Sequence, residues 1–215
     1  MAIPSSVRTQ LGDPSLMCQE RVDPWLPFAW PVQLGSDGIL WGSEAASDIE
    51  WAFVVLQLKL SHPPVPLVIL RDPSSEAGPV DTTARILAWG INRVVQGVLI
   101  DQQLPQYGFT ADASQGATLE ALLQLAPQIP DYAQALLALE LIYRGIDPGS
   151  QAKIRATCGE DVTKAAHQMN MMCIKPEDPD RTVLQVQHIA LKFCGDQEAA
   201  LAERLQVRLS DGRMV

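Results

Sequence analysis

The sequence has few of the features that mark a secreted protein or a membrane protein. Only four cysteines occur in 215 residues, Cys18, Cys158, Cys173 and Cys194, which is too few and too scattered for a disulfide scaffold. Polar or charged side chains interrupt every apolar run before it reaches the length of a membrane span. The first six residues lack the charged start and apolar run of a signal peptide. We therefore expect no membrane span and a reducing, cytoplasmic environment.

Positive charge is also scarce. The chain has 16 lysines and arginines against 25 aspartates and glutamates, which gives a net charge of −9, and neither half is basic. Proteins that bind nucleic acid strongly need clustered basic side chains that displace counterions from the phosphates. We therefore do not expect nucleic acid to be a strong direct ligand.

Catalytic and metal-binding motifs are missing too. The two glycines of residues 145–149 are not followed by Lys-Ser or Lys-Thr, so this segment is interpreted as a turn and not as a phosphate loop. The pairs His167 with Cys173 and His188 with Cys194 are six residues apart, a spacing that does not place two side chains on one helical face. The charges of Glu140 and Asp147 are interpreted as solvated. We expect no enzyme activity, no cofactor and no metal site.

Abundant hydrophobic residues, 47% of the chain, provide material for a packed core. Apolar residues recur at helical spacing over residues 80–103, which predicts one long helix. No alternation of strands and helices indicates a parallel sheet. The predicted fold class is all-α, with two small helical domains or one elongated helical domain. A linker over residues 101–114 would separate an N-terminal part, residues 1–105, from a C-terminal helical part, residues 106–215.

Further helices are predicted from caps, breakers and periodicity. The capping-box pattern Ser47-Asp48-Ile49-Glu50 indicates a helix start, and Pro63-Pro64 indicates its end. Residues 61–80, with five prolines, are interpreted as a rigid connector with room for one short strand. The remaining predicted helices cover residues 117–126, 131–144, 149–157, 160–173, 181–194 and 196–209.

The N-terminal arm, residues 1–46, is rich in proline and tryptophan, and we expect it to be irregular or extended. Its tryptophans, including Trp25 and Trp30, either pack on the main body or contact another protein. Two further segments have open alternatives. The Met-rich stretch with Met169 and Met172 is an adaptable partner surface or core filling. Cys158 and Cys173 form a reversible redox pair or two independent core thiols.

One family resemblance covers residues 84–173. Residues 87–95 (LAWGINRVV), which include Trp89 and Asn92, resemble the last long helix of the N-terminal domain in lentivirus-like retroviral capsid proteins. Gln115 and Gly116, with Glu120 shortly after, look like the opening of the family's major homology region. Residues 136–154 are similar to its penultimate helices, and the segment ending at residues 171–173 is similar to its last helix.

The resemblance to a retroviral capsid or a Gag-derived relative implies a self-assembling structural protein, a capsid-like shell component that would also occur in a virion. Its C-terminal helices would make dimer contacts and its N-terminal half ring contacts, so the main partner would be the chain itself. The resemblance also implies that Gln115, Gly116 and Glu120 hold the C-terminal fold together by hydrogen bonds.

Two other classes of function stay open. The first is a helical adaptor, or a viral matrix-type protein, that binds a partner protein through the N-terminal arm or the Met-rich helix. A matrix protein would need a basic face, which the acidic composition does not favour. The second is an enzyme whose site is assembled from scattered single residues and therefore carries no motif.

Overall fold

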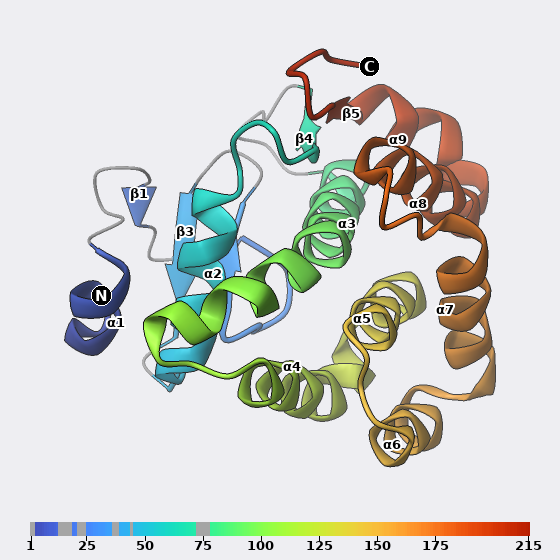
Figure 1. The fold of residues 1–215 in the computed structure, drawn as a ribbon. Coiled ribbons are helices and arrows are strands. Elements are labelled where there is room, and N and C mark those ends of the chain that lie inside the picture. Colours follow the sequence, from blue (N-terminus) through green and yellow to red (C-terminus); the bar gives the residue numbers. More distant parts are fainter. Residues whose placement is uncertain (1–2, 13–18, 21–24, 36–38, 44, 72–77) are drawn as a thin grey trace.

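A computed structural model describes residues 3–12, 19–20, 25–35, 39–43, 45–71 and 78–215. This part of the chain is mostly helical and carries two small sheets (Figure 1). The predicted helical class is therefore confirmed at the coarse level of a mostly helical fold, and the two small sheets are an addition to it.

The described helices keep most of the predicted bounds. They are α1 (Ser5–Leu11), α2 (Asp48–Lys59), α3 (Pro79–Gln103), α4 (Ala111–Leu125), α5 (Asp131–Tyr143), α6 (Pro148–Cys158), α7 (Glu160–Cys173), α8 (Pro179–Phe193) and α9 (Glu198–Arg204). Short 3-10 turns lie at η2 (Leu104–Tyr107), η3 (Ala126–Gln128) and η4 (Gly195–Gln197). The strands are β1 (Gln19–Glu20), β2 (Val32–Leu34), β3 (Ile39–Gly42), β4 (Leu67–Leu70) and β5 (Leu205–Arg208).

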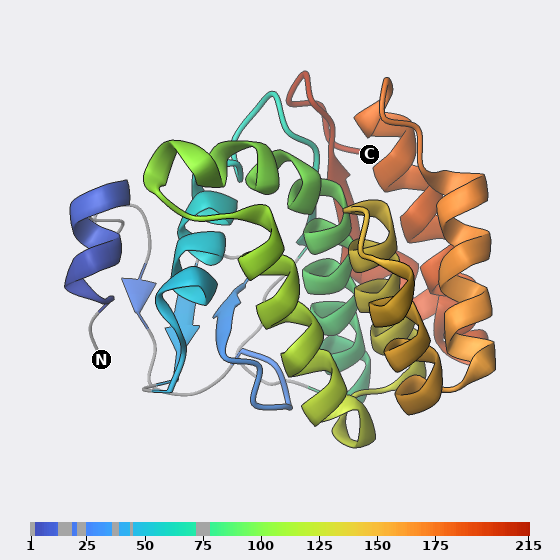
Figure 2. The same ribbon diagram turned by 60° about the horizontal axis from the view of Figure 1, so that its bottom comes forward.

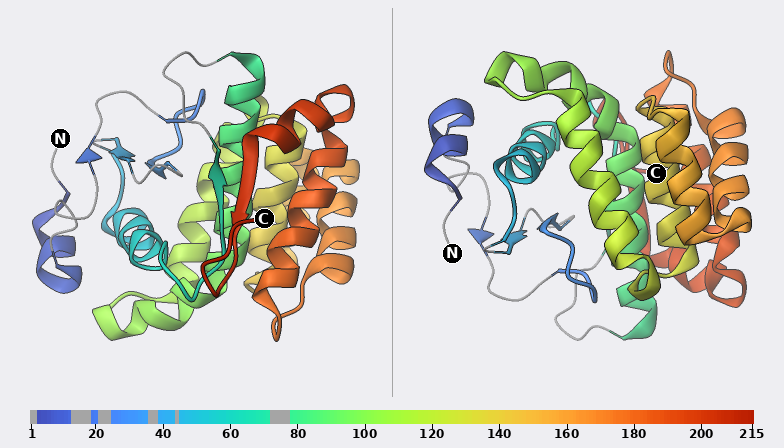
Figure 3. Two further views of the ribbon diagram at one scale, coloured as in Figure 1. Left: turned by 90° about the horizontal axis from the view of Figure 1, so that it is seen from above. Right: turned by 90° about the horizontal axis from the view of Figure 1, so that it is seen from below.

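Helix α3 lies in the middle of the molecule. The N-terminal strands and α2 lie on one side of it, and α5, α7 and α8 lie on the other (Figure 2, Figure 3). Glycine allows α3 and α5 to approach closely: a Cβ at Gly90 would lie 2.9 Å from Leu136 Cδ1, and one at Gly97 would lie 3.0 Å from Arg144 Cδ. The long helix predicted over residues 80–103 is confirmed, and it is the element against which both sides of the fold pack.

Two hydrophobic cores flank α3. The larger contains side chains from the segment around Trp25, from α3, α4, α5, α7, α8 and α9, and from β4 and β5. The smaller lies between α1, α2, β2, β3 and the end of α3. The larger core therefore draws on residues before and after position 105, and the division into domains at that position stays a prediction.

The linker predicted over residues 101–114 is mostly helical. Helix α3 continues to Gln103, η2 follows at once, and α4 starts at Ala111. Gly108, with φ of 79°, ends the turn in a left-handed conformation that glycine adopts without steric cost. Pro105 suggests a helix break, but proline fits the first turn of a helical segment, and here it is the second residue of the 3-10 turn.

The N-terminal arm is less irregular than predicted. Residues 25–31 lack helix and strand, as expected, but α1 forms before them. Val7 and Leu11 of α1 are buried in the smaller core, where α1 packs on α2. Strands β2 and β3 pair antiparallel, with Val32 opposite Gly42, and β1 pairs parallel with β3. These short elements are stabilised mainly by tertiary packing, so local sequence patterns predict them poorly.

The predicted helix over residues 196–209 is partly wrong. Helix α9 ends at Arg204, and residues 205–208 form β5, which pairs antiparallel with β4. In β5, buried Leu205 and Val207 alternate with half-buried Gln206 and Arg208, the period of two that a strand requires. The short strand predicted within residues 61–80 is confirmed as β4, and the capping box at Ser47 and Glu50 is present at the start of α2.

Among the helices in the described part of the chain, none combines the length and the apolar character needed to cross a membrane.

Candidate functional site

A buried network of charged side chains joins α3, α4 and α5. Glu140 is fully buried and receives hydrogen bonds from Arg93 Nε at 2.7 Å and from Arg144 Nη1 at 2.8 Å. Arg144 also binds Asp101, with Nη2 2.7 Å from Oδ1 and Nε 2.9 Å from Oδ2. Two guanidinium groups therefore face two carboxylates, and this pairing is what makes their burial tolerable.

The surroundings shift the pKa values of Arg93 and Arg144 in opposite directions. Burial lowers the pKa of Arg93, and its interactions with Glu140 offset only part of this effect. Burial also disfavours the charge of Arg144, but hydrogen bonds with Asp101 and the charge of Glu140 outweigh it and raise the pKa above its usual value. Arg144, which is held by two carboxylates, is thus the better-compensated cation.

Polar side chains of α4 complete this network. Ser114 Oγ accepts a hydrogen bond from Arg144 Nη2 at 2.7 Å, and Thr118 Oγ1 accepts one from Arg93 Nη2 at 3.1 Å. Gln115 donates to Asp101 at 3.0 Å and to the Arg144 carbonyl at 3.1 Å. Gln115 therefore links α4 to the end of α3 and to the residue that follows α5.

The other two residues of that motif make fewer contacts. Gly116 is exposed, and a Cβ built on it would meet nothing within 4 Å. Glu120 is exposed and accepts one hydrogen bond, from Gln124 of the same helix, at 3.3 Å. Neither of them joins the buried network.

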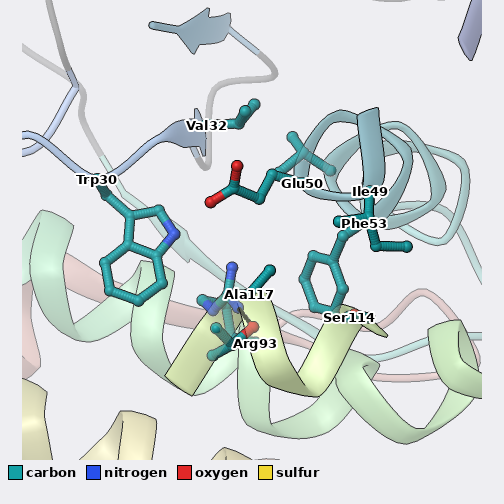
Figure 4. Close-up of a pocket in the computed structure, with 10 residues that line it drawn as sticks. Trp30, Val32, Ile49, Glu50, Phe53, Arg93, Ser114 and Ala117 are labelled. Atoms are coloured by element: carbon teal, nitrogen blue, oxygen red, sulfur yellow. Dashed lines mark hydrogen bonds between the residues drawn. The ribbon is translucent and has the colours of Figure 1, made fainter. Parts of the chain in front are cut away.

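Three aromatic rings lie close to the guanidinium of Arg93, and Figure 4 shows two of them, Trp30 and Phe53. The central carbon of the guanidinium lies 4.5 Å from the ring centre of Phe53, 5.2 Å from that of Trp30 and 5.4 Å from that of Trp89. Cations over aromatic faces gain electrostatic attraction, and the gain is larger where water is excluded. Trp89 is itself buried and packs edge-to-face on Phe28 and Trp30, so its place is in the core.

Asn92 has a separate structural role. Its side-chain amide donates to the Val68 carbonyl at 2.8 Å and accepts from the Val68 amide at 2.7 Å. The side chain thus occupies the edge of β4 opposite β5 and satisfies the two backbone groups that a further strand would bind.

The expected partner-contact residues divide into two groups. Trp25 and Trp30 are each 4% exposed and Met169 is 2% exposed, so these three belong to the larger core and a partner contact for them is wrong. Met172, by contrast, is 63% exposed.

The redox pair is also wrong. Cys158 and Cys173 are free; Cys158 ends α6 just before α7 begins, and Cys173 ends α7, which has 14 residues. A helix of this length holds its ends about 20 Å apart, whereas a disulfide needs Cα atoms within about 7 Å. Burial raises the pKa of both thiols. Cys18 lies outside the described residues. No group of three histidine, cysteine, aspartate or glutamate side chains in the described ranges could hold a metal ion.

An apolar groove is lined by residues of α7 and α8. These two helices lie on the side of the molecule away from α2 (Figure 1). The groove has a volume of about 690 Å³ and is lined by the end of α7, one face of α8 and the segment after β5, including Met172, Leu184, His188, Ile189, Leu209 and Arg213. Met171, beside it in sequence, is 78% exposed, and Leu184 is 39% exposed. We refer to this feature as the α7–α8 groove.

Sequence reasoning misses both the charge network and most of the groove. Solvated charges are expected at Glu140 and Asp147, but only Asp147 is exposed, where it caps α6 by accepting from Ser150. The sequence does contain a signal for the burial of Glu140, which lies in a helix that is apolar nearly all round. A charged residue in such a helix is buried and needs a partner of opposite charge. The groove has no comparable signal, since Leu184 and Leu209 come to line one surface only through the fold.

No family model, no curated protein and no solved structure matches this chain.

Proposed function

We propose that this chain is a self-associating structural protein, and that copies of it contact one another through the α7–α8 groove. In its finer form the proposal is a capsid-like shell component. That finer form is supported by the resemblance of residues 84–173 and by no other observation.

The exposed apolar side chains at the groove carry the proposal. Met171, Met172 and Leu184 are 78%, 63% and 39% exposed, and they lie beside or line a concave surface. Contiguous apolar surface of this kind on a folded protein commonly marks a contact with another molecule. Met is well suited to such a contact because its unbranched side chain adapts to the partner.

The size of the apolar surface indicates a weak contact. Complete burial of one Met or Leu side chain contributes about 1.5–3 kcal/mol, and part of this is already gained in the monomer. Association costs about 4–15 kcal/mol in lost freedom of motion. A single pairwise contact here is therefore only marginally stable. Many such contacts repeated in an assembly make association depend steeply on protein concentration, and we expect this dependence.

Charge affects the same equilibrium. Copies with a net charge of −9 repel one another at low ionic strength, and salt screens this repulsion. We therefore expect association to increase as salt is raised.

The resemblance adds a second line of support. The resemblance implies dimer contacts through the C-terminal helices, and α7 carries the segment that is similar to the family's last helix. The exposed Met171 and Met172 lie at the end of α7. The same region is thus indicated by the family pattern and by the exposed apolar surface.

The test is sedimentation velocity over a wide range of protein concentration at about 0.05 M and about 1 M salt, where the screening length falls from above 10 Å to about 3 Å. The variants are Met172→Gln and Leu184→Gln, which keep helix propensity and make the groove polar. Phe193→Gln is the matched control, because Phe193 is 50% exposed on α8 but does not line the groove.

We expect the wild-type chain and Phe193→Gln to form larger species as concentration and salt rise, and the two groove variants to remain monomeric. Electron microscopy of the larger species would show whether they are closed shells, rings or tubes. A wild-type chain that stays monomeric throughout, or an equal effect of all three variants, would contradict the proposal.

A further inference from the structure

A small cavity with both polar and apolar lining lies next to the charge network, where the N-terminal arm, α2, α3 and α4 meet. Its volume is about 20 Å³, and its lining includes Trp30, Glu50, Phe53, Arg93 and Ala117 (Figure 4). This cavity is separate from the α7–α8 groove, so a ligand bound in it is independent of the proposed function.

Arg93 reaches this cavity with a hydrogen-bonding capacity that the protein does not use. Its Nε and Nη2 bind Glu140, and Nη2 also binds Thr118. Its third nitrogen, Nη1, has no hydrogen-bond partner among the described residues, although the residue is only 2% exposed. In Figure 4 the guanidinium points into the space below Glu50. Because this donor faces the cavity and no protein group accepts from it, the position favours a ligand that accepts a hydrogen bond.

Two further groups face the same space. The indole nitrogen of Trp30 points toward the cavity in Figure 4 and binds no group in the described part of the chain, although Trp30 is 4% exposed. Glu50 uses its Oε2 to accept from the amide and hydroxyl of Ser47, whereas its Oε1 makes no hydrogen bond to any residue described. The cavity therefore offers two kinds of donor, from Arg93 and Trp30, and one strong acceptor, from Glu50.

We propose that this cavity binds one water molecule, which accepts hydrogen bonds from Arg93 Nη1 and Trp30 Nε1 and donates one to Glu50 Oε1. The size of the cavity selects this ligand: a single water needs about 10–15 Å³ of such space, so about 20 Å³ holds one water and excludes a larger molecule. Three hydrogen bonds are the usual number for a buried water.

The bound water links three segments that are far apart in the sequence. Trp30 belongs to the N-terminal arm, Glu50 to the first turn of α2, and Arg93 to the middle of α3. The water thus extends the charge network from α3, α4 and α5 to α2 and the arm.

The first measurement is the magnetic relaxation dispersion of water ¹⁷O, which counts waters that exchange slowly with solvent. The variant Ala117→Leu fills the cavity, since Ala117 lines it on α4. Ala113→Leu is the matched control, because it makes the same change at an exposed position of the same helix. We expect Ala117→Leu to lose one slowly exchanging water relative to the wild-type chain and to Ala113→Leu.

The change in thermal midpoint, Tm, caused by Ala117→Leu is a second readout, and its sign distinguishes a cavity that holds water from an empty one. Filling a dry cavity adds apolar contacts and raises Tm, whereas displacing a bound water leaves Arg93, Trp30 and Glu50 without partners and lowers Tm. We expect Ala117→Leu to lower Tm by several degrees relative to Ala113→Leu.

A crystal structure at high resolution decides the geometry. One ordered water within hydrogen-bond distance of all three atoms supports the proposal. A direct contact between Arg93 and Glu50 that closes the cavity would overturn it, as would an unchanged number of slow waters together with a raised Tm in Ala117→Leu.

Discussion

Asn92 of α3 binds both backbone groups of Val68 in β4, with hydrogen bonds of 2.8 Å and 2.7 Å. Both residues are buried, so no solvent replaces these bonds if the side chain is removed. One side-chain amide therefore takes the place of a neighbouring strand along one edge of β4.

This relationship predicts a large effect for Asn92→Ala. Two buried backbone groups of Val68 lose their partners, and each such loss costs about 1–3 kcal/mol. We expect the free energy of unfolding, measured by urea denaturation, to fall by about 2–5 kcal/mol. The control is Gln102→Ala, at an exposed position of the same helix, where a change within about 0.5 kcal/mol is expected. A small effect at Asn92 would mean that Val68 finds other partners.

Removing the shared carboxylate of the charge network should destabilise the fold. In Glu140→Gln, Arg93 and Arg144 lose a buried counter-charge, and breaking a buried ion pair in this way costs about 3–5 kcal/mol. Glu120→Gln removes an exposed charge of α4 and serves as the control. If the paired change Glu140→Leu with Arg93→Met recovers most of the loss in urea denaturation, the cost arises from the unpaired charge and not from packing. Equal stability of Glu140→Gln and the control would contradict the network's role.

Replacement by alanine should lower the stability of the fold at Gly90 and raise it at Gly116. In Gly90→Ala the new methyl group would lie 2.9 Å from Leu136 Cδ1 and 3.2 Å from its Cβ, and overpacking of this kind costs about 1–3 kcal/mol. In Gly116→Ala the methyl group meets nothing within 4 Å, and alanine gains up to about 1 kcal/mol in a helix interior. Thermal unfolding of both variants checks the signs. A destabilised Gly116→Ala would indicate that this glycine has a role that the monomer does not reveal.

Oxidation should not join Cys158 to Cys173. The length of α7 lies between the two residues and holds them about 20 Å apart, so a disulfide between them requires that α7 unfold. We expect mass spectrometry after treatment with a mild oxidant to find no peptide that links the two cysteines. Detection of that link in protein that retains its native circular dichroism would contradict the position of α7.

The sequence predicts those elements whose signals are local. The long helix α3 follows from apolar spacing within residues 80–103, and α5, α6, α7 and α8 follow from breakers such as Gly145 and Gly159 at their ends. The hydrogen-bonding role of Gln115 is implied by the family resemblance and not by the chemistry of the residue alone.

The missed features depend on contacts between distant residues. Strand β5 has a partner in β4 that lies far away in the sequence, and only this pairing explains why residues 205–208 leave the helix. In the same way, the burial of Glu140 depends on Arg93, which belongs to another helix. Cys158 and Cys173 are separated by the length of α7. No short window of the sequence contains these facts.

The pairing of β4 with β5 has a consequence for the order of folding. The two strands belong to segments separated by most of the chain, and closing so long a loop is entropically unfavourable until the intervening helices have packed. The contact between α3 and β4 through Asn92 spans a much shorter loop and can form earlier. In chevron experiments we therefore expect the β4–β5 sheet to be unformed in the transition state, so that substitutions in β5 would speed unfolding and leave the rate of folding almost unchanged.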